Sequence, residues 1–248
     1  MSTLESISLG ELVAEAALLT RVDRKYVVPR VEAGRLLAAV DPATRVLEID
    51  GSRASAYESV YFDTPDLLSY RMAALARRRR FKLRTRSYLD SREAWLEMKT
   101  RGARSTTVKE RVPHDFAAAT SLDRAARSYA DEALEAIGLP DPAGLYLVPT
   151  LVTRYDRTTL LQPDGARATI DVDLSWEGDD GQVLTRPGLA IVETKSGSRT
   201  SGLDRLLWSR GYRPTSISKF GTGLAALRPD LPSNKWARVI RRHFQEAA

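Results

Sequence analysis

The sequence of 248 residues contains 38 Lys and Arg against 32 Asp and Glu, which gives a formal net charge of +6 and a pI near 9.6. This excess of positive charge favours acidic partners such as phosphates, nucleic acid or an anionic membrane surface. The chain has no Cys and only two His. These counts exclude disulfides, thiolate catalysis and Cys-based metal sites, and they argue against a multi-His metal centre.

The amino-terminal residues and the hydropathy pattern bear on location. The first twenty residues include three Glu and no Lys or Arg, which argues against a secretory signal. No run approaches the roughly 18 uninterrupted apolar residues of a transmembrane helix. We therefore expect a cytoplasmic protein without a membrane segment of its own.

Hydrophobic periodicity predicts both helices and strands along the chain. Helical spacing predicts helices at Leu9–Leu19, Val31–Val40, Pro65–Leu75, Ser121–Ile137, Gly202–Arg210 and Lys235–Gln245. Alternation with a period of two predicts strands at Lys25–Val28, Glu58–Phe62, Arg80–Tyr88, Ala94–Arg101, Thr106–Pro113, Leu147–Leu161, Ala168–Trp176 and Ala190–Lys195. Turns are expected at Gly102–Ala103 and Asp164–Gly165. Because strands mostly follow strands, we predict one antiparallel α+β domain over residues 1–248, with a core at about 18–227 and a carboxyl-terminal helix at about 235–245.

Lysine is the rarer basic residue, with 7 Lys against 31 Arg. Six of the Lys lie in or beside predicted strands, and only Lys235 lies outside one. An ammonium is a compact point charge and a guanidinium is a planar fork, so the two are not interchangeable in a crowded site. Our central hypothesis is that ammonium and guanidinium groups on facing strands form a cage for a polyanion.

Several predicted strands carry charges on one face and apolar residues on the other, because residues two apart on a strand share a face. Phe81 and Leu83 alternate with the cations Arg80, Lys82, Arg84 and Arg86. The other charged faces are Glu97 with Lys99 and Arg101, Lys109 with Arg111, Arg157 and Arg167 on either side of the 164–165 turn, Asp171 with Asp173, and Glu193 with Lys195.

These charged faces have a plain alternative explanation, since one side of an antiparallel sheet commonly meets water. The run Arg77–Arg80 is expected to be in part such a solvated patch. However, like charges opposite one another on adjacent strands are destabilising unless an anion lies between them. Closing the sheet into a barrel would turn the charges into a lumen and leave the apolar faces for helices. We therefore predict an antiparallel β-barrel with a charged lumen, flanked by helices.

Among the acids, Glu193 is the best candidate metal ligand, with Glu97, Asp171 and Asp173 behind it. Hard divalent cations bind carboxylate oxygens and commonly bridge a protein carboxylate to substrate phosphates. The alternative is that these acids only pair with neighbouring Lys or Arg. The two interpretations weigh evenly for Glu193, and pairing is favoured for Glu97.

Nine short segments form an ordered set along the chain. They are Asp23–Tyr26, Tyr61–Pro65, Phe81–Arg86, Leu96–Thr100, Val108–Arg111, Arg154–Arg157, Ala168–Asp171, Val192–Lys195 and Ser218–Phe220. Each segment alone is a weak signal, but the ordered set is specific. It resembles the VTC domain, the polyphosphate polymerase domain of the vacuolar transporter chaperone family, which belongs to the wider triphosphate tunnel metalloenzyme, or CYTH-like, fold.

The resemblance implies a barrel whose charged tunnel binds a triphosphate or polyphosphate, and transfer of a nucleotide's terminal phosphoryl group onto polyphosphate. Such transfer needs mainly positioning and charge neutralisation. The implied catalytic residues are Lys25, Arg84, Lys99, Arg157 and Lys195. The implied substrate-binding residues are Lys82, Arg86, Lys109, Arg111, Arg167 and Lys219. Glu193 would hold a divalent metal, Mn²⁺ or Mg²⁺.

The chain departs from the family pattern in two places. Arg21, Asp23 and Lys25 stand where the wider superfamily often has alternating glutamates, so a second metal site is not expected. Ser216 stands where family members can carry a second basic residue near Lys219, which implies weaker binding of phosphate at that end of the tunnel. No inositol-phosphate-sensing domain or membrane segment is recognised, so coupled translocation of polymer would come from partners, such as a membrane protein, or be absent.

Three rival functions accompany the polymerase hypothesis. A tripolyphosphate or nucleoside triphosphate hydrolase would use water as the acceptor, and a binding module would hold polyphosphate without turnover. Nucleic-acid binding is least favoured, because Phe81, the aromatic residue among the cations of 80–86, lies on the opposite face. The expected partners are therefore a nucleoside triphosphate and polyphosphate, and not nucleic acid.

Overall fold

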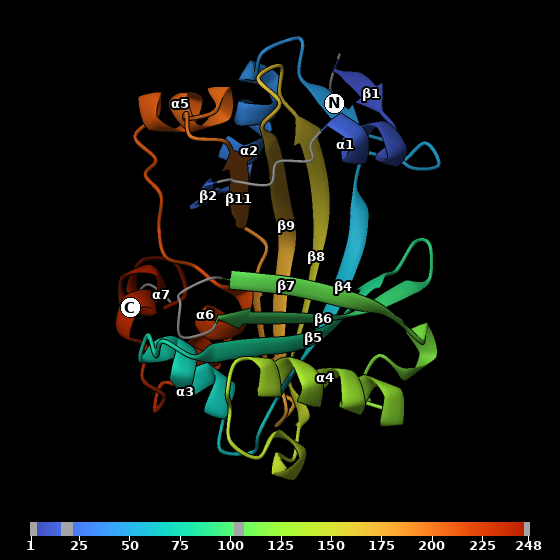
Figure 1. Ribbon diagram of the computed structural model, residues 1–248. Coiled ribbons are helices and arrows are strands. Elements are labelled where there is room, and N and C mark those ends of the chain that lie inside the picture. Colours follow the sequence, from blue (N-terminus) through green and yellow to red (C-terminus); the bar gives the residue numbers. More distant parts are fainter. Residues whose placement is uncertain (1–3, 16–21, 102–106, 246–248) are drawn as a thin grey trace. The chain divides into compact units, whose positions relative to one another are not determined.

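The computed structural model describes residues 4–15, 22–101 and 107–245 (Figure 1). The chain divides into two compact units, each built from several segments. The first unit comprises residues 1–56, 155–174 and 185–216, and the second comprises residues 57–154, 175–184 and 217–248. Two long strands, β8 (Val148–Leu161) and β9 (Arg167–Gly178), contribute residues to both units.

The described strands form a mainly antiparallel sheet. Its main path runs in the order β2-β11-β9-β8-β4-β5-β6-β7, while β10 pairs with β9, β3 with β8, and β1 runs parallel to β3. The remaining strands are β1 (Glu5–Ile7), β2 (Val22–Pro29), β3 (Arg45–Leu47), β4 (Ser55–Asp63), β5 (Arg80–Tyr88), β6 (Glu93–Arg101), β7 (Thr107–His114), β10 (Val183–Arg186) and β11 (Leu189–Ser196). The α+β class and the antiparallel order are confirmed. Among the described residues no ladder joins β2 to β7, so hydrogen bonding does not close the sheet.

In the first unit, helices cover the apolar faces of β2, β9 and β11. Tyr26, Ile170 and Val192 lie in a buried cluster to which α2 (Arg30–Ala39) and α5 (Gly202–Ser209) contribute Leu36 and Leu207. The other helix of this unit is α1 (Leu9–Glu15). Removing this much apolar side-chain surface from water is the main force that holds the unit together.

The start of α5 is fixed by a buried carboxylate. Ser201 and Asp204 form a capping box, in which each side chain accepts from the other residue's backbone N–H. The same Asp204 carboxylate also accepts hydrogen bonds from Tyr26 Oη at 2.7 Å and Thr194 Oγ1 at 2.6 Å. This network connects α5 to β2 and β11, the strands that carry Lys25, Glu193 and Lys195.

In the second unit, β5, β6 and β7 lie side by side and α4 (Arg124–Ala136) packs against them (Figure 1). Phe81, Leu83, Leu96 and Met98 point into the core beneath α4 and are at most 1% exposed. The other helices of this unit are α3 (Leu68–Ala74), α6 (Lys219–Leu227) and α7 (Ala237–His243). Because successive strand residues alternate between faces, burial of these apolar residues turns the charged residues of the same strands to the other side.

The carboxylate of Asp63, at the end of β4, holds the beginning of α3. It is fully buried and accepts hydrogen bonds from the backbone N–H groups of Thr64, Ser69 and Tyr70 at 2.8 Å each. Burial raises the pKa of Asp63 to about 6, although these hydrogen bonds favour its ionised form. The Tyr61–Pro65 segment of the family pattern therefore has a structural use here.

The predicted elements agree with the structure where periodicity is strong. The 164–165 turn is confirmed by a hydrogen bond from Gly165 N to Gln162 O, and Gly165 has a φ of +75°. The prediction missed the short strands β1, β3 and β10 and the helix α6. The predicted Gly102–Ala103 turn and residues 16–19 of the first predicted helix lie outside the described residues. In the described part of the chain, no helix combines the length and apolarity needed to cross a membrane.

Candidate functional site

The charged face of the second unit places cations directly opposite one another. In the ladders of β5, β6 and β7, Lys82 pairs with Lys99, and Lys99 pairs with Lys109. One row along, Arg80 pairs with Arg101. Like charges at such positions repel and destabilise the free protein. The face is therefore suited to an anion with several negative charges.

A buried glutamate partly compensates these cations. Glu97, 3% exposed, lies 2.6 Å from Arg84 Nη2 and 3.0 Å from Lys109 Nζ, with Arg86 Nη1 at 3.8 Å. Burial by itself would raise the pKa of Glu97, but attraction by Arg84, Arg86 and Lys109 outweighs it and holds the pKa well below its usual range. Glu97 is thus an ionised internal counter-ion, as the pairing interpretation expected.

Two cations of this face are held by neighbouring side chains. Arg84 donates through Nε to Glu97 at 2.8 Å and through Nη1 to Tyr61 Oη at 3.0 Å. Lys82 Nζ donates to Ser218 Oγ at 2.7 Å. Ser218 is the cap of α6, where its Oγ accepts from Gly221 N at 3.2 Å, and the predicted site residue Lys219 is the first residue of that helix.

The first unit contains a second charged cluster around Glu193. The carboxylate of Glu193 lies 3.5 Å from Lys25 Nζ and 3.1 Å from Lys195 Nζ. Arg157 binds Asp171 through two hydrogen bonds of 2.6 and 2.8 Å and also attracts Glu193. Burial would raise the pKa of Glu193, but Lys25, Lys195 and Arg157 together lower it well below its usual range. The carboxylate therefore stays ionised, as a metal ligand must.

The acidic side chains near Glu193 are few and are paired with basic groups. Among the described residues, no group of three or more Asp, Glu or His side chains is placed to hold a metal. Asp171 is engaged by Arg157, and Asp173 pairs with Arg30 and is 44% exposed. Glu193 is itself paired with Lys25 and Lys195, so a metal bound there would need phosphate oxygens or water as its other ligands.

The predicted site residues fall into two sets, one in each unit. The first unit holds Lys25, Arg157, Arg167, Glu193 and Lys195, and there Arg167 pairs with Lys195 across β9 and β11. The second unit holds Lys82, Arg84, Arg86, Lys99, Lys109, Arg111 and Lys219. Sequence reasoning missed the anchoring roles of Tyr61 and Ser218, although both lie inside segments of the family pattern.

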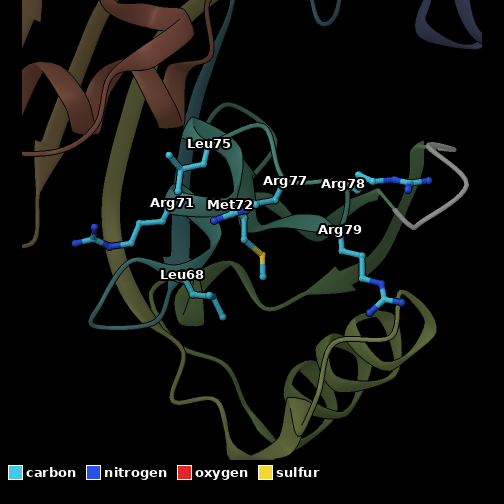
Figure 2. A pocket seen from close by; sticks show the side chains of 7 residues that line it. All are labelled: Leu68, Arg71, Met72, Leu75, Arg77, Arg78 and Arg79. Carbon is cyan, nitrogen blue, oxygen red and sulfur yellow. The ribbon is translucent and has the colours of Figure 1, made fainter.

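The run Arg77–Arg79 lies at a different surface of the second unit. It lines a cavity of about 590 Å³ together with Leu68, Arg71, Met72 and Leu75 (Figure 2). All three arginines are exposed, and no predicted site residue lines this cavity. Their exposure fits the solvated basic patch that the sequence suggested for part of the run, although Arg79 Nη1 also donates to Gly138 O at 3.1 Å.

Comparisons with known proteins give one family match and several matches of fold. The model of the VTC domain family matches residues 20–228. A Hippeastrum protein, described as an adenylyl cyclase candidate with a dominant triphosphatase activity, has a similar fold at 18% identity and a TM-score of 0.51. That match covers 87% of this chain and 100% of the other. An adenylate cyclase candidate from Bacillus halodurans matches at 13% identity and a TM-score of 0.49, over 80% of this chain and 94% of the other. No curated protein matches the chain.

Proposed function

We propose a polyphosphate polymerase function from the premise that this chain belongs to the VTC domain family, whose model matches residues 20–228. The enzyme would transfer the terminal phosphoryl group of a nucleoside triphosphate to a polyphosphate chain. The observation that carries the proposal is the row Lys82, Lys99 and Lys109 in register across three strands. Such a row is favourable only when a multiply charged anion lies against it.

The chain's own residues would act by positioning and charge neutralisation. Arg84 is already oriented by Glu97 and Tyr61, and Lys82 by Ser218, so neither needs to be reorganised when phosphate binds. Preorganised donors of this kind stabilise the charge that develops on the transferred phosphoryl group. In the cluster of the first unit, the residues proposed to bind phosphate are Lys25, Arg157 and Lys195.

Glu193 would hold a divalent metal, Mn²⁺ or Mg²⁺, against the phosphates. When bound, such a metal neutralises phosphate charge and fixes the orientation of the transferred group. The depressed pKa of Glu193 supports this role, because the carboxylate stays ionised at pH values well below the usual range of a Glu. Lys25 and Lys195, which lie beside Glu193, would supply positive charge for the phosphates.

Replacing Glu193 by Gln should abolish ADP formation from ATP in the presence of Mn²⁺, by at least about a thousandfold, because the metal loses its carboxylate ligand. Metal-independent binding of tripolyphosphate should change little, since the cations remain. Coupled ADP release measures the first effect and calorimetry the second. The matched variant Glu193→Asp keeps the charge and should retain part of the turnover. Full turnover in Glu193→Gln would show that Glu193 is not a ligand of the metal.

The affinity for tripolyphosphate should fall as the pH rises above 8. Burial and repulsion by Arg86 and Arg84, opposed by Glu97, lower the pKa of Lys109 to about 8. Because a bound anion favours the ammonium, binding should be about tenfold weaker at pH 9 than at pH 7 if only the charged form binds. Calorimetry of the wild type and Lys109→Arg at both pH values separates this loss from titration of the ligand. If the affinity for tripolyphosphate depends on pH equally in the two proteins, deprotonation of Lys109 is not the cause of the loss.

Hydrolysis is a second candidate activity, supported by the triphosphatase activity described for the Hippeastrum protein of similar fold. The same cations and the same metal ligand would then transfer the phosphoryl group to water. The two activities differ only in the acceptor, so the reaction products decide between them.

A further inference from the structure

Three aromatic residues lie at one end of the charged face of the second unit. Tyr57 of β4 pairs with Tyr88 of β5, and in the next row Arg86 pairs with Trp95 of β6. Ladder partners share a face, and so do residues two apart on one strand. Tyr88 and Trp95 are therefore on the same face as Arg84 and Glu97.

These rings pair with one another and with guanidinium groups. The Tyr57 and Tyr88 ring centroids are 5.0 Å apart, and Arg86 Cζ lies 5.8 Å from the Tyr57 centroid. On the other side of Arg86, Arg111 Cζ lies 4.4 Å from the Trp95 ring centroid. Indole rings and guanidinium planes are both surfaces on which nucleobases stack.

Trp95 differs from the tryptophans that build the core. Trp176 and Trp236 are each 1% exposed, whereas Trp95 is only partly buried. It lies on the charged face, while Leu96 and Met98 of the same strand occupy the apolar one. Trp95 is thus not part of the buried cluster beneath α4, and on the charged face its ring is in contact with the Arg111 guanidinium.

The spacing along β6 suits a nucleotide. A strand rises by about 3.4 Å per residue, so the row of Glu97 lies about 7 Å from Trp95 and the row of Lys99 about 14 Å from it. An extended nucleoside triphosphate spans a comparable length. A base stacked at Trp95 would therefore bring its phosphates to Arg84 and then to the lysine row.

We propose that Trp95 with Arg111, flanked by Tyr57 and Tyr88, is the platform on which the base of the nucleoside triphosphate stacks. This assignment rests on the proposed function and adds the polarity of the substrate, with the base at the aromatic end and the terminal phosphate at the lysine row. Stacking is tolerant of base identity, so ATP and GTP should bind with similar affinity.

The test compares ATP with tripolyphosphate, which carries the phosphates but no base. In the full chain, Trp95→Leu should weaken ATP binding by about tenfold, while tripolyphosphate binding stays within about twofold of the wild type. Trp95→Phe keeps an aromatic ring and should restore most of the ATP affinity. Calorimetry with both ligands, without metal, gives the four comparisons.

For Trp95→Leu, an ATP affinity equal to that of the wild type would overturn the inference. An equal loss of affinity for ATP and for tripolyphosphate would also overturn it, because it would indicate a purely structural role for the ring. If Trp95→Leu does not fold, Tyr88→Leu provides the same comparison at the neighbouring ring. If the wild type binds tripolyphosphate and the ring variants bind ATP as tightly as the wild type does, only the stacking inference is contradicted. If the wild type binds neither ATP nor tripolyphosphate, the proposed function is contradicted as well.

Discussion

Replacing Lys99 by Ala should stabilise the free protein and at the same time weaken its binding of tripolyphosphate by at least about tenfold. Lys99 lies between Lys82 and Lys109 in the ladders, so its removal relieves two like-charge contacts. Relief of that repulsion is worth about 1 kcal/mol, or about 2–4 °C in melting temperature for a chain of this size. A charged hydrogen bond to phosphate contributes about 1.5–3 kcal/mol, which accounts for the loss of binding.

Arg71→Ala is the matched control for Lys99→Ala. It removes an exposed cation that lines the cavity of Figure 2, away from the lysine row. This control should leave tripolyphosphate binding unchanged and should not raise the melting temperature. A less stable Lys99→Ala protein, with tripolyphosphate bound as tightly as by the wild type, would contradict a polyanion-binding role for the row.

Replacing Glu97 by Gln should destabilise the free protein by about 3 kcal/mol, which corresponds to a melting temperature lower by about 10 °C. Glu97 is 3% exposed and is the counter-ion of Arg84 and Lys109. Its loss leaves these charges uncompensated in a partly buried environment. Tripolyphosphate should restore most of the lost stability, because it supplies negative charge to the same cations. Thermal unfolding with and without the ligand measures both effects.

The contribution of Glu97 should also depend on pH. Its pKa is lowered on folding, so the stabilisation is present above its ordinary pKa of 4.5 and is lost as the pH falls toward the lower pKa of the folded state. Wild type and Glu97→Gln should therefore approach the same stability in acid and differ most near neutral pH. A constant difference between the two proteins from pH 7 to pH 3 would show that the charge of Glu97 is not what stabilises the fold.

Strands with strict alternation could be predicted from the sequence. The prediction for β5 has the observed bounds, Arg80–Tyr88, because basic residues alternate with Phe81 and Leu83 in the sequence, and in the structure buried and partly exposed positions alternate along the whole strand. β1, β3 and β10 have three or four residues each, too few to establish a period. These three segments are strands because neighbouring strands pair with them, and the alternation of their own side chains does not reveal it.

Helix α6 was missed for a physical reason. Gly221 and Gly223 lower its helix propensity, so the segment resembles a loop. In the structure both glycines allow aromatic rings to approach the helix. A Cβ at Gly221 would lie 2.1 Å from the Trp236 ring, and one at Gly223 would lie 2.2 Å from Trp176. The residues that weaken the local signal are those that the packing of α6 requires.

The candidate site was predictable along each strand but not across strands. Alternation alone places Lys82, Arg84 and Arg86 on one face. The register that sets Lys82 against Lys99 depends on how the strands pair, and the anchors Tyr61 and Ser218 come from distant parts of the chain. A single sequence carries no direct signal for such contacts, so the aromatic end of the face was also missed.

The fate of the terminal phosphoryl group tests the central claim most directly. The full-length protein is incubated with ATP labelled at that position and Mn²⁺, and the products are resolved into ADP, free phosphate and polymer. The account predicts ADP together with labelled polyphosphate, and neither product in Glu193→Gln. Labelled free phosphate without polymer would contradict the polymerase proposal in favour of hydrolysis, and the absence of turnover despite tight tripolyphosphate binding would leave only a binding module.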